Sequence, residues 1–378
     1  MKPNKSGERK FSPILVRGNN NTNSDGGGGL QFSGNPILSF NIHLEPRYLV
    51  LGKWFRILQS LTNVSTVTFS GCDLHEKKIQ MLMETLRYLP HLSTLDLDGN
   101  QITSLLPLAS IASTEIWYLR LSNNRITDIT GLELFTGLIY LQLDRNQISS
   151  ISQLRNLTAL RYLDLDHNQI SSISQLQNLT ALGGLKLSHN RITSISSLAL
   201  LTALWRLHLN NNRIISLAGL ELLSVLKILY LDHNEISSLS PLQNVAGLTW
   251  LDLYDNNITS LASFHTISGL HHLDLRHNHI ISLVPLENFT GLVHLNLHHN
   301  QITTISPLQS LVLLVYLNLG SNYITTVLPL QFLTHLEALA IDGNQINTTD
   351  INALVRKKLP RVALFSCAGQ NVKRGDCT

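Results

Sequence analysis

The sequence has few cysteines and no long apolar run. Its three cysteines, Cys72, Cys367 and Cys377, are too few and too scattered for a disulfide framework, and none of them form a metal-spaced pair. We therefore expect free thiols, with a Cys367–Cys377 bridge as the alternative in an oxidising compartment. Because no run of about 18 apolar residues occurs, we expect no insertion into a membrane.

Other features of common functional classes are also missing. The first 29 residues lack the apolar core of a secretory signal, which indicates an intracellular, cytoplasmic protein. Charged residues make up 14% of the chain and the net charge is +3, too mild to indicate nucleic-acid binding. The run GGGG at 26–29 lacks the Lys-Ser/Thr of a phosphate loop, and no nucleophile elbow or metallopeptidase helix is found. We therefore expect neither catalysis nor a cofactor.

A repeat fills most of the chain. Asparagine recurs every 22 residues from Asn124 to Asn344, and Asn100 precedes the series by 24 residues. One unit, residues 160–181, reads LRYLDLDHNQISSISQLQNLTA. Its apolar residues alternate at 163 and 165, as in a strand that buries one face. Asn168 follows at the turn, where its amide can satisfy backbone N–H and C=O groups, so we expect stacked structural asparagines.

The pattern L-x-x-L-x-L-x-x-N-x-I is typical of leucine-rich repeats, and residues 64–366 resemble the class with 22-residue units. The resemblance implies an α/β solenoid, a horseshoe with a parallel β-sheet on its concave side. A unit this short leaves no room for a full helix, so we expect mostly 3₁₀ or short turns on the convex side. The pattern predicts 14 strands, with helical caps at both ends.

The ends of the chain depart from the repeat. Residues 1–40, with asparagine and glycine runs, are expected to form a disordered arm. Residues 41–63 are expected to form an N-terminal helical cap, 64–358 the solenoid, and 359–378 a C-terminal cap and tail. Helical periodicity is present at 75–88, and we expect another helix near 350–358, before a last degenerate strand.

Two groups of leucine-rich-repeat proteins use units of this length. Residues 300–314, NQITTISPLQSLVLL, resemble the units of bacterial internalins. The regulatory subunits of protein phosphatase-1 have units of the same spacing, and residues 359–362 partly resemble their C-terminal cap. Internalins normally carry a signal peptide and a cell-wall anchor, which we do not expect here. Both resemblances imply a protein partner on the concave face and no cofactor.

Positions 3, 5, 7 and 8 of each unit should face the concave side or its rim. Position 3 carries mostly rings, and Tyr, Trp and Arg are the residues that anchor interfaces. The alternative is that the rings stack and only stabilise the sheet. Ten aspartates against five bases on these positions should repel nucleic acid and favour a basic or polar protein partner. The candidate partner-binding residues are Tyr118, Tyr140, Asp144, Tyr162, Asp164, Asp166, Arg206, Tyr230, Trp250, Asp252, Tyr254, His272, Asp274, His294 and Tyr316.

Histidine is unevenly distributed, with eight of the sixteen between residues 265 and 299. His272 and His294 share position 3, while His277 and His299 share position 8. Imidazoles near a carboxylate suit zinc. A pH-sensitive patch and a plain polar surface are the alternatives, and we expect the plain surface and no metal.

The sequence thus predicts a monomeric protein-interaction scaffold or regulatory subunit that binds a protein partner on its concave face. The first alternative is a secreted or translocated adhesin or effector that binds a host protein. The less favoured one is a metal-dependent enzyme that uses the histidine patch.

Overall fold

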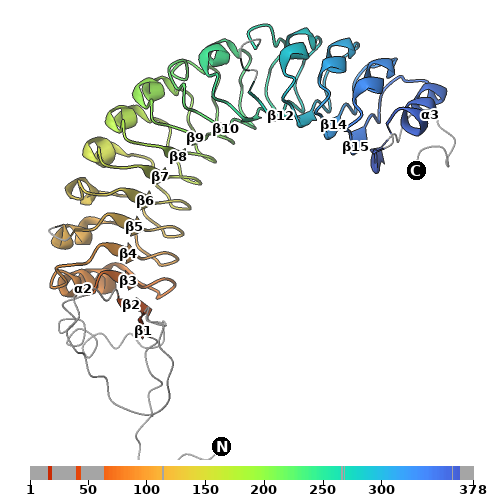
Figure 1. The fold of residues 1–378 in the computed structure, drawn as a ribbon. Helices are drawn as coiled ribbons and strands as arrows, with labels where there is room; N and C mark the ends of the chain where they lie inside the picture. Colours follow the sequence, from red (N-terminus) through yellow and green to blue (C-terminus); the bar gives the residue numbers. More distant parts are fainter. Residues whose placement is uncertain are drawn as a thin grey trace, which may run out of the picture. The chain divides into compact units, whose positions relative to one another are not determined.

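The computed structural model describes residues 16–18, 40–43, 64–112, 115–264, 267, 269–359 and 361–366 of the 378-residue chain. The chain divides into two compact units, residues 1–146 and 147–378. In both units each repeat contributes one short strand to a sheet (Figure 1). No described helix has the length and apolar character needed to cross a membrane.

The described residues of unit 1 form six strands. They are β1 Val16–Gly18, β2 Phe40–His43, β3 Thr66–Thr68, β4 Thr94–Asp96, β5 Tyr118–Arg120 and β6 Tyr140–Gln142. Strand β1 pairs antiparallel with β2, and from β2 to β6 each strand is parallel with its neighbour.

The described residues of unit 2 form ten strands, and each is parallel with its neighbours in the unit. They are β7 Tyr162–Asp164, β8 Gly184–Lys186, β9 Arg206–His208, β10 Ile228–Tyr230, β11 Trp250–Asp252, β12 His272–Asp274, β13 His294–Asn296, β14 Tyr316–Asn318, β15 Ala338–Ala340 and β16 Leu364–Ser366. Strands β3 to β16 are therefore the fourteen that the repeat pattern predicts.

Short 3₁₀ helices form the side of each unit that faces away from the strands (Figure 1). Unit 1 has η2 Leu106–Ile111 and η3 Leu132–Leu134. Unit 2 has η4 Ser152–Asn156, η5 Ser174–Asn178, η6 Ser196–Leu200, η7 Ser240–Asn244, η8 Val284–Asn288, η9 Ser306–Ser310 and η10 Leu328–Phe332. The expected 3₁₀ turns are confirmed. A 22-residue repeat has too few residues for a longer helix on the side opposite its strand.

Two α-helices occur in the described residues, α2 Glu76–Leu86 and α3 Thr348–Lys357, near the two expected positions. Helix α3 begins after Asn347, whose side chain accepts a hydrogen bond from the Thr349 N–H at 3.1 Å. Of the helical cap expected at 41–63, only residues 41–43, which belong to β2, are described. Cys367 and Cys377 also lie outside the described residues. The arm expected at 1–40 is described only at β1 and Phe40, so it stays a prediction.

The asparagines at the turns are structural, as the repeat predicts. Asn190 accepts a hydrogen bond from the Ile170 N–H at 3.0 Å and donates to the carbonyl oxygens of Leu165, Leu187 and Ser188. Each asparagine thus joins its own turn to the backbone of the preceding repeat. The leucines and isoleucines at the pattern positions of the repeat, such as Leu163, Leu165 and Ile170, are completely buried behind the strands.

At the N-terminal end of this series a cysteine takes the asparagine position. The Cys72 side chain is buried, and burial raises the pKa of its thiol to about 11. The Cys72 N–H instead donates to Asn100 Oδ1 of the next repeat at 3.0 Å. A protonated, buried thiol at this position is a core residue and not a reactive group.

Candidate protein-binding face

We call one surface of unit 2 the strand face. It is formed by the side chains at positions 3, 5 and 7 of the repeats that contain β7 to β15. Parallel strands in register place equal positions of successive repeats side by side, so Trp250 pairs with His272 and His294 with Tyr316. Position 8 follows at a turn where the backbone is left-handed, with φ of 55° at His167 and 49° at His277. That turn places position 8 at the rim of the face.

Four rings of position 3 form a continuous stack, which we call the ring ladder. The ring centroids of Trp250 and His272 are 3.5 Å apart, those of His272 and His294 4.2 Å, and those of His294 and Tyr316 4.1 Å. All four side chains are partly exposed. Lateral stacking therefore does occur, and it leaves part of every ring open to a partner.

The two imidazoles of the ring ladder are held neutral. Burial lowers the pKa of His272 to about 4, with a further contribution from His294, and burial also lowers the pKa of His294. At neutral pH the ladder is consequently an uncharged aromatic surface. A pH-sensitive patch at this position would titrate only in acid.

The aromatic row continues toward β9. Tyr230 lies next to Trp250, with 6.1 Å between ring centroids, and next to His208 at 4.6 Å. Arg206 donates from Nε to His208 Nε2 at 2.8 Å. Burial lowers the pKa of His208 to about 4, so this imidazole is also neutral and can accept that bond.

The carboxylate of Asp164 is not available to a partner. It is 3% exposed and forms an ion pair with Lys186, whose Nζ lies 2.8 Å from Asp164 Oδ2 and 5.8 Å from the centroid of the Tyr162 ring. Asp166 accepts a hydrogen bond from the Ser188 N–H at 2.6 Å. Burial raises the pKa of Asp166 to about 7, so it is partly protonated at neutral pH.

Asp274 is engaged in the same way. It is 4% exposed, and Arg276 donates from Nε to its two oxygens at 3.0 and 2.8 Å. The Arg276 guanidinium also lies 4.5 Å from the centroid of the Tyr254 ring. Asp164 and Asp274 are thus paired with cations, and the pKa of Asp166 is raised. The strand face is therefore less acidic than the aspartate count predicts.

Three of the candidate residues, Tyr118, Tyr140 and Asp144, belong to unit 1. Tyr118 and Tyr140 stack with centroids 4.4 Å apart, and Arg120 pairs with Asp96 at 3.1 Å. Asp144 accepts a hydrogen bond from the Ser122 hydroxyl. Tyr162 belongs to unit 2.

Position-8 histidines of adjacent repeats lie side by side in pairs, as the 22-residue spacing predicts. The ring centroids of His167 and His189 are 4.0 Å apart, and those of His277 and His299 4.5 Å. His233 Nδ1 lies 2.7 Å from Asp255 Oδ2. No group of three or more metal-ligating side chains is placed to hold an ion within the described ranges, and His265 lies outside them.

Two residues that shape this face, Lys186 and His208, are missing from the candidates, as is the exposed Trp205 at position 2, which lies outside positions 3, 5 and 7. Lys186 stands 22 residues after Asp164, a spacing that puts the two in register and could have revealed their ion pair. His208 was likewise in position 5 of its unit. Trp205 is 47% exposed and packs on Gly183, whose added Cβ would lie 3.1 Å from the indole ring.

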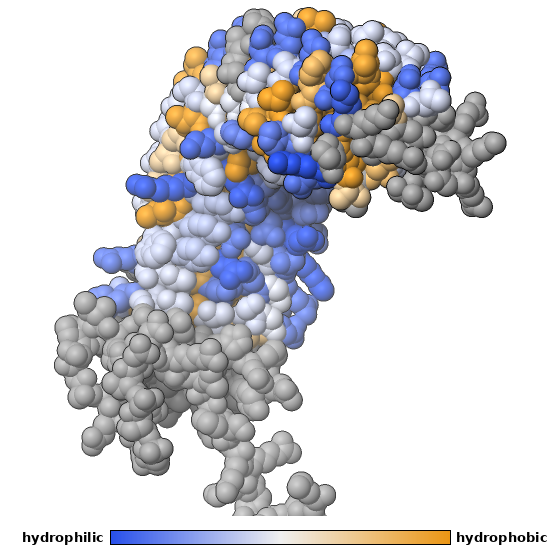
Figure 2. Space-filling model, turned by 45° about the vertical axis from the view of Figure 1, so that its right-hand side comes forward, coloured by the Kyte–Doolittle hydropathy of each residue, from blue (hydrophilic) through white to orange (hydrophobic). Residues whose placement is uncertain are grey.

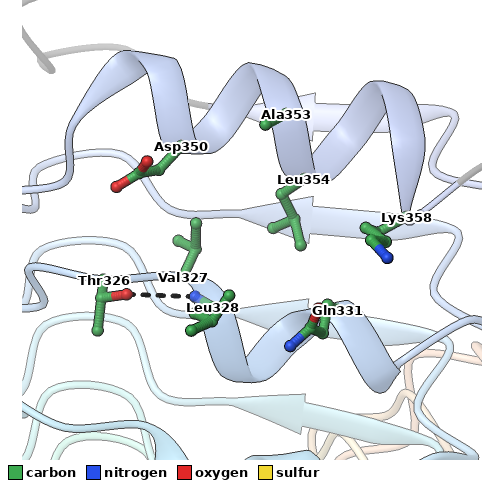
Figure 3. Close-up of a pocket in the computed structure, with 8 residues that line it drawn as sticks. All are labelled: Thr326, Val327, Leu328, Gln331, Asp350, Ala353, Leu354 and Lys358. Atoms are coloured by element: carbon green, nitrogen blue, oxygen red, sulfur yellow. Dashed lines mark hydrogen bonds between the residues drawn. The ribbon is translucent and has the colours of Figure 1, made fainter.

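Two other surface features lie away from the strands. A hollow of about 310 Å³ separates η10 from α3, and its lining includes Leu328, Leu354 and Lys358 (Figure 3). Hydrophobic side chains also gather on the C-terminal part of unit 2, in the nearest part of the view (Figure 2). The exposed apolar residues in this part include Ile281, Val284, Val312, Leu313, Leu328 and Phe332.

Three family models of leucine-rich repeats match the chain. The model described as "Leucine rich repeat" matches residues 114–170 and 224–280. A model of two repeat copies matches 158–200, 268–310 and 290–332, and a third model matches 88–105. A comparison with curated protein sequences finds no match.

Solved structures share the fold. An internalin from Listeria monocytogenes is 27% identical, with 84% of each chain covered and a TM-score of 0.66. A leucine-rich-repeat protein from Leptospira interrogans is 24% identical over 86% of this chain and 88% of that one, with a TM-score of 0.75. The leucine-rich-repeat domain of APL1 is 22% identical over 82% of both chains, with a TM-score of 0.71. The 22-residue repeats of this chain, the stacked asparagines at its turns (the asparagine ladder) and these matches point to one family. The chain belongs to the leucine-rich-repeat proteins.

Proposed function

We propose that this protein is an interaction scaffold or regulatory subunit whose strand face in unit 2 binds a protein partner, with the ring ladder at the centre. The exposed row of stacked rings is the observation that carries this proposal. Aromatic residues supply much of the energy of protein interfaces. Rings already fixed by stacking lose little conformational entropy on binding, which favours affinity.

The surroundings of the ring ladder support a protein partner. Repeat proteins use the extended surfaces that their strands create as binding surfaces. Arg206 and Asp252, which are partly exposed beside the row, provide polar groups that fix the orientation of a bound chain. The proposed partner is basic or polar, and the protein acts as a monomer.

Replacing Trp250 with alanine tests this function. The partner is first identified by affinity purification and mass spectrometry from the source organism, and its affinity is then measured by calorimetry. We expect Trp250→Ala to weaken binding by about 2 kcal/mol, or about thirtyfold, because an anchoring ring is removed.

Trp205→Ala is the matched control, since it removes an exposed indole that lies outside the ring ladder. This variant should bind the partner with nearly unchanged affinity. If Trp250→Ala binds as well as the original protein while both variants remain folded, the rings serve only to stabilise the sheet and the proposal fails.

The likeness to a Listeria internalin favours a second candidate, a secreted or translocated adhesin or effector that binds a host protein. Both candidates use the same face and differ in where the protein acts. Cell fractionation with immunoblotting separates them. Protein found only in the cytoplasmic fraction of the source organism rejects the adhesin.

A further inference from the structure

At two places on the strand face an aromatic ring and a carboxylate lie side by side. At each place a lysine or arginine of this same chain contacts both of them. Lys186 lies over the Tyr162 ring and pairs with Asp164. Arg276 lies over the Tyr254 ring and pairs with Asp274. The chain thus shows which chemistry such a pair accepts, namely a lysine or arginine that makes both an ion pair and a cation–π contact.

Asp252 has similar neighbours and no base. It is in register with Tyr230 on one side and with Asp274 on the other. Trp250 and Tyr254, two positions away along the chain, lie on the same face. Oδ1 of Asp252 accepts a hydrogen bond from the Tyr254 N–H at 3.1 Å, and Asp252 forms no ion pair with any residue that the structure describes.

The bases near Asp252 are already used. The Nε group of Arg276 is bound to both oxygens of Asp274, and Arg206 donates to His208. A carboxylate that is largely removed from water without a cation is unfavourable, and burial raises the pKa of Asp252 to about 7. The negative charges of Asp274 and Asp232 raise this pKa further. The Tyr254 N–H and the charge of Arg276 lower it, but by less than burial raises it.

We propose that Asp252, with Tyr230 beside it, receives a lysine or arginine side chain of the protein partner. The inference rests on the proposed function and adds one specific contact to it. Charge complementarity and the two filled pairs of the same face support a basic side chain as the occupant. Arginine suits the site best, since its planar guanidinium stacks on rings and binds a carboxylate through two N–H groups.

The test uses the full chain and the tripeptide acetyl-Gly-Arg-Gly-amide, with the neutral citrulline peptide as its control. Trp250 lies two residues from Asp252 on the same face of β11, so the NMR signal of its indole N–H reports changes at Asp252. We expect a saturable shift of this signal with the arginine peptide and none with the citrulline peptide. Equal shifts with both peptides, or none with either, overturn the proposal.

The affinity should also depend on pH. The groups that face Asp252 are Tyr230 and Asp232 on the β10 side, Trp250 and Tyr254 in its own repeat, and His272, Asp274 and Arg276 on the β12 side. Because a cation binds the ionised carboxyl, binding should tighten about tenfold from pH 6 to pH 8, across a pKa of about 7. No change with pH contradicts a carboxyl with this pKa as the binding group.

Asp252→Asn keeps the shape of the side chain and removes its charge. It should weaken arginine-peptide binding at pH 8 by about tenfold or more and abolish the pH dependence. Asp255→Asn is the matched control, because this exposed carboxylate lies at the rim beside His233. Unchanged binding by Asp252→Asn overturns the inference.

The same variants separate this inference from the proposed function. A partner whose affinity falls with Trp250→Ala but not with Asp252→Asn uses the ring ladder without the carboxylate, so the inference fails and the function stands. A partner whose affinity responds to neither substitution contradicts both.

Discussion

Asn278→Leu should lower the free energy of unfolding by at least about 3 kcal/mol, because it leaves several buried backbone groups without partners. Asn278 is 3% exposed. Its Oδ1 accepts from the Ile258 N–H at 3.0 Å, and its Nδ2 donates to the carbonyl oxygens of Leu253, Leu275 and Arg276. Leucine has a similar volume but can make none of these bonds. Urea unfolding followed by circular dichroism measures the loss as a lower midpoint.

Asn257→Leu is the matched control. Asn257 follows the ladder asparagine of the preceding repeat, and it is exposed. Exposed substitutions of this kind usually change stability by no more than about 0.5 kcal/mol. Equal unfolding midpoints for the two variants would show that the ladder bonds contribute nothing net to stability.

Gly219→Ala should destabilise the protein by about 3 kcal/mol, the sum of backbone strain and overpacking. Gly219 has a φ of 108°, a conformation that residues with a side chain rarely adopt. An added Cβ would lie 2.6 Å from the Ile195 carbonyl oxygen and 2.8 Å from the Ser196 Cα. Both atoms belong to the backbone of the preceding repeat and cannot move aside without breaking the stacking of the units.

Gly137→Ala provides the comparison for this variant. Gly137 is exposed, its φ is not positive, and no heavy atom lies within 4 Å of an added Cβ. Alanine there should leave the melting temperature unchanged or slightly higher, because it restricts the unfolded chain. A melting temperature for Gly219→Ala equal to that of Gly137→Ala would mean that the backbone near Ile195 relaxes at little cost.

The sequence by itself determined the repeat, the strands, the 3₁₀ turns and the structural asparagines. Each unit of a solenoid packs only on its neighbours, so a side chain and its counterpart 22 residues later must meet. The stack of Trp250, His272, His294 and Tyr316 follows from this rule, and stacking of the position-3 rings was the alternative to partner binding that the sequence left open. The same rule could have revealed the pair of Asp164 and Lys186.

Only the tertiary structure decided the charge and accessibility of the face. Asp164 and Asp252 occupy the same position in their units, yet one is paired with a lysine and the other has no base and a raised pKa. The difference depends on burial, on which cation reaches the carboxylate and on which hydrogen bonds it accepts, since these set the free energy of its ionised form. A residue count treats every aspartate as a full negative charge, so it could not distinguish a carboxylate that is already neutralised from one that can still bind a cation.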